Sequence, residues 1–122
     1  MDKAQAIHSF WNTFGVPAYD ENSVPDGAKF PYLTYNVVTD SLGVVVSLHA
    51  NIWDKSTSWA TVSQLSERIA RRIKTYSDYI IEFDDGYIYL CGGTPFAQRL
   101  NDENPDIKRI YINVQAEYLC AY

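Results

Sequence analysis

The feature that most constrains the fold of this chain is a long alternation of apolar and polar residues in its last part. The apolar positions are Ile110, Ile112, Val114, Ala116, Tyr118 and Cys120, and the residues between them are Arg109, Tyr111, Asn113, Gln115 and Glu117. Because successive side chains of a strand point to opposite faces of a sheet, this alternation predicts one long strand. One face of the strand is expected to be buried and the other to be in water.

Two segments show the three-and-four spacing of apolar residues that is typical of helices. The first runs from about Asp2 to Phe14; Asp2 and Gln5 are placed as in a capping box, and Gly15 ends the helix. The second runs from Trp59 to Tyr76 and follows the capping side chains of Asp54 to Ser58. Its opposite face carries Gln64, Glu67, Arg68, Arg71 and Lys74. This helix should therefore lie on a sheet with one side exposed.

Two hairpins are predicted between and after these helices. Tyr32–Thr39 and Val44–Trp53 are rich in β-branched and aromatic residues, and the four residues 40–43 between them favour a turn. Tyr79–Phe83 and Tyr87–Cys91 flank Asp-Asp-Gly at residues 84–86. Asp-Gly between two apolar runs is a strong hairpin signal, because both central residues of the turn can adopt positive φ.

The residues from Gly92 to Asp106 are predicted to be an irregular connection. Gly92 and Gly93 should end the preceding strand, and a connection this long in a small domain favours a functional or interface role. Four of its residues are candidates for a contact between subunits, namely Pro95, Phe96, Leu100 and Asn101. The competing interpretation is that Phe96 and Leu100 fold back and cover the edge of the chain's own sheet.

The predicted elements follow the order α-β-β-α-β-β-β and define an α+β fold. A mostly antiparallel sheet of four to five strands should pack against the two helices. A chain of 122 residues has the commonest size of a single domain, so residues 1–122 are expected to share one core. No apolar run approaches the roughly 20 residues that span a bilayer, and we expect no membrane partner.

The composition indicates binding to proteins rather than to nucleic acid. The formal net charge is −5, and the basic cluster falls on the polar face of the second helix, so free DNA or RNA is a poor candidate ligand. The chain has 10 Tyr, 5 Phe and 3 Trp, more large rings than a small domain can bury completely. Partly exposed Tyr and Trp are favoured at interfaces, although ordinary variation between small domains also explains such a content.

No catalytic or metal-binding motif is present in the sequence. Cys91 and Cys120 are too few for a disulfide framework and too isolated for a CxxC motif; both are expected to be reduced and buried. His49 with either cysteine is the only nucleophile and base pair available, and an ordinary strand position explains His49. Turn chemistry explains the acidic residues at 82–85. We therefore expect no enzyme activity, no metal and no cofactor.

Three motifs resemble small tail-terminator and head–tail joining proteins of tailed bacteriophages, a group that also includes minor capsid and neck proteins. They are Pro31-Tyr32-Leu33-Thr34-Tyr35, Trp53-Asp54-Lys55-Ser56 and the segment from Asp106 to Val114. The resemblance implies a structural subunit of a hexameric ring that caps the finished tail tube and docks it to the head connector. The partners would be further copies of the chain, the tail tube protein and the head connector protein. DNA would pass through the centre without specific binding.

The resemblance also implies a location at the head–tail junction of the virion, with assembly in the cytoplasm of a bacterial host. Two other classes of function stay open from the sequence. One is a cytosolic homo-oligomeric protein-binding module without any connection to phage. The other is a small hydrolase that uses His49 or the acidic hairpin, in which a point change at either place would abolish turnover and leave the fold intact.

Overall fold

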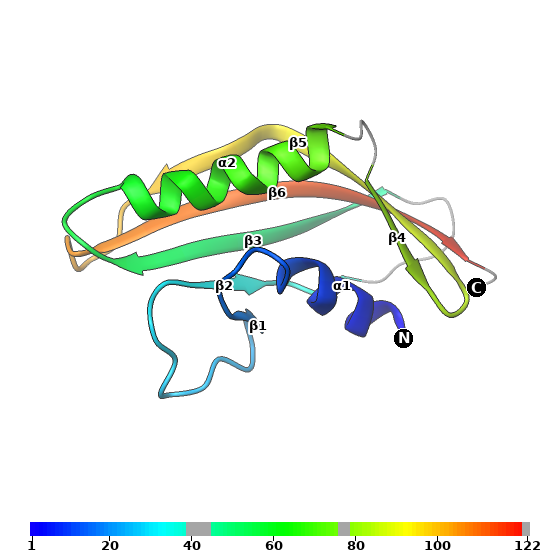
Figure 1. Cartoon of the computed structure of the whole chain (residues 1–122), viewed down its shortest axis with the longest axis horizontal. Coiled ribbons are helices and arrows are strands. Elements are labelled where there is room, and N and C mark those ends of the chain that lie inside the picture. Colours follow the sequence, from blue (N-terminus) through cyan, green and yellow to red (C-terminus); the bar gives the residue numbers. More distant parts are fainter. Residues whose placement is uncertain (39–44, 76–78, 121–122) are drawn as a thin grey trace.

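The computed structural model describes residues 1–38, 45–75 and 79–120, and within them two helices and six strands (Figure 1). The helices are α1 (Lys3–Trp11) and α2 (Ala60–Thr75). The strands are β1 (Ala18–Asp20), β2 (Tyr32–Tyr35), β3 (Val45–Lys55), β4 (Tyr79–Phe83), β5 (Gly86–Leu100) and β6 (Ile107–Cys120). They form one sheet in the order β1-β2-β3-β6-β5-β4, with the longest strands β3, β6 and β5 in its middle.

The sheet is mixed and curls around the helices. β1 pairs with β2 in parallel, and every other neighbouring pair is antiparallel. α1 contacts both β1 and β4, which are the two edges of the sheet, and α2 lies along β3, β5 and β6. The α+β class and the two helices agree with the sequence prediction. The expected four to five strands are corrected to six, and the sheet contains one parallel pair.

β6 lies in the middle of the sheet, and one of its faces is buried, as its alternation predicted. Its six apolar residues are all buried, with exposed fractions from 0% to 8%, and they belong to one cluster with the apolar faces of both helices. From α2 this cluster includes Val62, Leu65, Ile69 and Ile73. The apolar face of β6 is therefore covered by helices, and its polar face is left uncovered.

The beginning of α1 confirms the predicted capping box. The backbone N–H of Gln5 donates to Asp2 Oδ1 at 2.8 Å, and the backbone N–H of Asp2 donates to Gln5 Oε1 at 2.9 Å. The helix ends at Trp11, three residues earlier than predicted, because the chain leaves the helical path before Gly15, whose φ is 85°. Phe14 beyond the helix is still buried, so the apolar spacing extended further than the helix itself.

α2 begins one residue after the predicted start. Ser58 Oγ accepts the backbone N–H of Ala60 at 3.1 Å, which satisfies one of the first amides of the helix. Asp54, in contrast, belongs to β3 and is buried there. The predicted last residue, Tyr76, lies outside the described residues.

The irregular connection predicted from Gly92 to Asp106 is wrong for its first half. β5 continues past Gly92 to Leu100 and stays paired with β6, with a shift of register between Gly92 and Ala97. A Cβ atom at Gly93 would lie 2.3 Å from Nδ2 of Asn113, so this glycine permits a close approach of two strands. Glycine and proline here mark an irregularity within a strand rather than its end.

The strands of the two predicted hairpins are paired antiparallel, as expected, but with other bounds. Tyr32 pairs with Trp53, and Phe83 pairs with Gly86. The predicted turn at residues 40–43 and the end of the first strand at Thr39 lie outside the described residues. β1 was missed by the sequence analysis, because three residues are too few to show an alternation. Within the described residues, no helix has both the length and the hydrophobicity to cross a membrane.

Candidate interaction surface

The face of the sheet that points away from the helices, which we call the open face, carries the candidate site. Antiparallel partners place their side chains on the same face, so the open face consists of rows that cross the sheet. The rows are Tyr32, Trp53, Arg109 and Leu100; Thr34, Asn51, Tyr111 and Gln98; His49 and Asn113; Ser47, Gln115 and Cys91; Val45, Glu117, Tyr89 and Ile80; and Leu119, Tyr87 and Glu82. Amide and aromatic side chains predominate.

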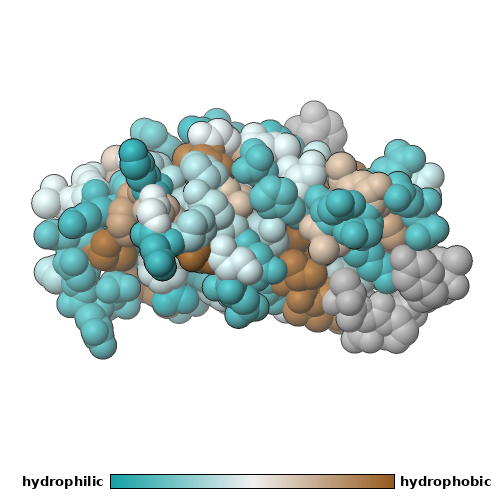
Figure 2. Space-filling view, turned by 90° about the horizontal axis from the view of Figure 1, so that it is seen from below, coloured by the Kyte–Doolittle hydropathy of each residue, from teal (hydrophilic) through white to brown (hydrophobic). Residues whose placement is uncertain are grey.

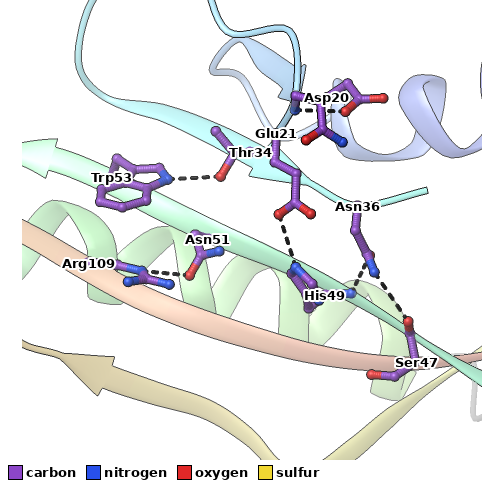
Figure 3. A network of polar contacts seen from close by, with 10 residues as sticks. Asp20, Glu21, Thr34, Asn36, Ser47, His49, Asn51, Trp53 and Arg109 are labelled. Carbon is purple, nitrogen blue, oxygen red and sulfur yellow. Dashed lines mark hydrogen bonds and ion pairs between the residues drawn. The ribbon is translucent and has the colours of Figure 1, made fainter. Parts of the chain in front are cut away.

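A polar network orders the first two rows (Figure 3). The indole N–H of Trp53 donates to Thr34 Oγ1 at 2.9 Å, and Arg109 Nε donates to Asn51 Oδ1 at 2.8 Å. The guanidinium of Arg109 also lies over the Trp53 ring, 4.9 Å from its centroid. The hydrogen bond and the cation–π contact both hold the guanidinium of Arg109 in one orientation. This end of the open face is therefore ordered before any partner binds.

His49 connects the middle of the open face to the segment that follows β1. His49 Nε2 lies 3.0 Å from Glu21 Oε2, and the imidazole stacks on Tyr111 with 5.6 Å between ring centroids. The backbone N–H of His49 donates to Asn36 Oδ1 at 2.7 Å (Figure 3). The neighbours of His49 in the described structure are thus a carboxylate, a ring and an amide. A cysteine is not among them, and the arrangement serves to fix the chain.

The open face ends in exposed hydrophobic side chains. Val45 is 55% exposed, and Ile80 and Tyr87 are each 49% exposed, all within the last two rows. A shallow hollow of about 180 Å³ between these rows and the next is lined by Val45, Tyr89, Cys91, Gln115 and Glu117, among others. On the side of the molecule shown in Figure 2, hydrophobic surface likewise occurs as small separate areas between hydrophilic side chains.

The four residues predicted for a subunit contact do not form one surface. Phe96 is half-buried and packs against the hydrophobic core, whereas Leu100 lies on the open face beside Arg109. Pro95 and Asn101 are exposed. The position of Phe96 agrees with the competing interpretation, in which it covers the chain's own sheet. A subunit contact through these residues stays a prediction.

The sequence analysis found the outward positions of β6 but missed their neighbours from β2, β3 and β5. The alternation in β6 identified Arg109 to Glu117 as a polar face. Which residues lie beside them depends on pairing between strands that are far apart in the chain, as in the hydrogen bond from Ser47 Oγ to Asn113 Oδ1, which joins residues 66 positions apart. A local pattern contains no information on such pairs.

The exposure of Cys91 corrects the sequence prediction that both cysteines are buried. Cys91 is exposed because it pairs with Gln115 in a row of the open face, while Cys120 is 8% exposed on the helix side of β6. We expect one thiol of the folded protein to react with a disulfide reagent and the second to react only after unfolding, since reactivity requires access to the thiolate. Cys91→Ser should remove the fast phase, and Cys120→Ser should retain it. Two equally fast thiols in the native protein would contradict the assignment.

The side chains that bind metal ions in proteins are chiefly those of His, Cys, Asp and Glu. Within residues 1–38, 45–75 and 79–120, no cluster of three or more such residues is present. A wide open hollow of about 700 Å³ lies beside α1 and is lined by residues such as Ala4, His8 and Asn12. Its histidine, His8, has its Nδ1 2.9 Å from the hydroxyl oxygen of Tyr35.

A solved structure of another protein has a fold similar to that of this chain. No family model and no curated protein matches the sequence. Among solved structures, a chain from the virion of a native gene transfer agent particle is similar to this chain, with a TM-score of 0.60 and 17% sequence identity. The match covers 96% of this chain and 85% of that chain. At this identity the likeness shows that the two chains share a fold over nearly their whole length.

Proposed function

We propose that this chain is a structural subunit of a phage-like virion. The observation that carries the proposal is the shared fold with a chain of a gene transfer agent virion, which extends over 96% of this chain. A match of this extent includes the open face together with the helices and the core. The open face itself supports an assembly role, because it presents ordered aromatic and arginine side chains, which are enriched at protein interfaces.

More specifically, we propose a neck protein that forms a hexameric ring, acting as a tail terminator or head–tail joining subunit. The resemblance of three sequence motifs to that group supports the ring, as does a fold whose central strands leave one face uncovered. The ring would bind the tail tube protein on one side and the head connector protein on the other. The chain has a net charge of −5, so DNA would pass through the ring without tight binding.

We also propose that the chain has no catalytic activity and needs no cofactor. His49, the residue on which a hydrolase would depend, lies against Glu21, Tyr111 and Asn36 in the middle of the open face. This placement supports a packing role. Exchange of His49 for Gln should therefore leave assembly intact.

Electron microscopy of the purified protein tests the proposed function. We expect closed rings with a central hole, and light scattering should give the mass of six copies that the proposed hexamer requires. A protein that remains monomeric up to the highest soluble concentration would contradict the ring. Tight binding of duplex DNA at physiological salt would contradict passive passage of DNA through it.

A further inference from the structure

The charges of the open face are separated along the length of the sheet. The cations Lys55 and Arg109 lie at the end where β6 begins, which we call the basic end; the carboxylates Glu82 and Glu117 lie at the other end, the acidic end. Arg109 and Glu117 are eight residues apart on one strand, a distance of about 26 Å. The two charges therefore cannot meet within one molecule.

Neither end neutralises its own charge in the described structure. The ion pairs among the described residues join Met1 to Asp84, His49 to Glu21 and Arg71 to Glu67, and none of them includes Arg109, Glu117 or Glu82. Arg109 uses Nε for Asn51 and its flat face for Trp53, which leaves the terminal guanidinium nitrogens to a partner outside these residues. An interface that brings opposite charges together gains in rate and specificity of association.

Hydrophobic side chains accompany the charges at both ends. Trp53 and Leu100 flank Arg109, with Tyr32 beyond Trp53, and Val45, Ile80 and Tyr87 lie near Glu117 and Glu82. The hollow beside Glu117 also presents the Tyr89 ring and the Gln115 amide. A carboxylate, an aromatic ring and an amide around one hollow form a suitable environment for a guanidinium or an ammonium group.

We propose that the basic end of the open face of one copy docks on the acidic end of the next copy. The proposal rests on the proposed function, since it names the surface through which the subunits of the ring would meet. β5 and β6 arch along their length (Figure 1), so the two ends of the open face do not lie in one plane and each can contact a different neighbour. Such a contact joins two different patches, and contacts of this kind form a ring when the rotation between successive copies closes.

Charge reversal tests this contact directly. Arg109→Glu places like charges against Glu117 of the neighbour, and Glu117→Arg places like charges against Arg109; each variant alone should lower the association constant at least about tenfold. An equimolar mixture of the two variants restores opposite charges at every contact when the copies alternate. We expect the mixture to regain the assembly that each variant has lost, as measured by light scattering.

Matched controls separate the contact from general effects of charge. Arg71→Glu and Glu67→Arg make the same changes on the exposed side of α2 and should assemble like the wild type. Thermal unfolding checks that each variant is folded, which matters for Arg109 because it supports Asn51 and Trp53. If Arg109→Glu fails to fold, Glu117→Arg still tests the contact, because it changes the other side of the same contact. Labelling of Cys91, which lies beside the acidic end, should become slower in the assembled wild type.

The outcomes distinguish this contact from the proposed function. If the wild type forms rings and both reversal variants form them equally well, the open face binds another virion protein and the proposed contact is wrong, while the ring stands. If the mixture of variants assembles no better than either variant alone, the pairing of Arg109 with Glu117 is also wrong. A wild type that stays monomeric overturns the ring and the contact together.

Discussion

Replacing Gly86 by alanine is expected to lower the free energy of unfolding by about 3 kcal/mol, because the new methyl group has no room. Gly86 pairs with both Phe83 and Cys120 at the point where β5 enters the sheet between β4 and β6. A Cβ atom there would lie 2.1 Å from the carbonyl oxygen of Leu119 and 2.9 Å from Cα of Cys120. Both obstacles are backbone atoms of the central strand, so the strands themselves would have to separate.

Urea unfolding followed by circular dichroism measures this effect. Gly27→Ala is the matched control, because its Cβ would meet no atom within 4 Å, and we expect a change within about 0.5 kcal/mol. If the two variants unfold at the same urea concentration, the tight approach of β5 to β6 at Gly86 is wrong. Since the acidic end of the open face is built on this hairpin, Gly86→Ala should also weaken assembly.

Gly86 also shows how a correct prediction can have a different physical reason. The Asp-Gly pair predicted a hairpin on the basis of positive φ in its turn, and the hairpin is present. Gly86, however, lies in the extended strand, and among the described glycines the left-handed conformation occurs at Gly15. The glycine is needed because of a neighbouring strand that lies more than 30 residues away along the chain, at Leu119 and Cys120.

The sequence predicted those elements whose signal is local. β6, both helices and the β4–β5 hairpin each show their periodicity or their capping residues within a short stretch. The buried positions of β6 followed from alternation alone, and the capping box of α1 from two residues. Patterns of this kind depend on the geometry of a single strand or helix, so tertiary contacts do not change them.

Elements that depend on a distant partner were predicted less well. The second half of β5 contains Gly93 and Pro95, which disfavour a regular strand, yet pairing with β6 maintains it up to Leu100. β1 exists because its three residues pair with β2. The candidate site has the same origin, since each row of the open face combines residues from two to four strands. A sequence identifies the members of such a row only after the order of the strands is known.

Removing the hydroxyl group of Tyr118 is expected to have opposite effects on stability at neutral and at strongly alkaline pH. The side chain is 0% exposed, and its hydroxyl donates to the carbonyl oxygen of Val38 at 2.5 Å. Burial, and to a smaller extent the nearby Cys120, raises the pKa of Tyr118 from 10.0 to about 12. The folded protein thus retains the phenolic proton at a pH at which the unfolded chain has lost it.

The sign of the effect follows from the two pKa values. The stability that protonated Tyr118 contributes is fully present below about pH 10, where the folded and unfolded states both hold the proton. It is lost as the pH rises through about 12. Across this window the free energy of unfolding should fall by about 1.4 kcal/mol per pH unit, or about 2.7 kcal/mol in total. At neutral pH, Tyr118→Phe should cost about 1 kcal/mol, since a buried hydrogen bond is lost.

The stability curves of the wild type and of Tyr118→Phe should therefore cross near about pH 11, above which the variant is the more stable protein. Urea unfolding at neutral pH and at several values between about pH 9 and 12 measures both curves. Tyr87→Phe serves as the control, because this ring is 49% exposed, and its curve should follow that of the wild type. Parallel curves for the wild type and Tyr118→Phe over the whole range would show that the Tyr118 phenol titrates as freely as in the unfolded chain, and the dependence derived from its burial on the helix side of β6 would be wrong.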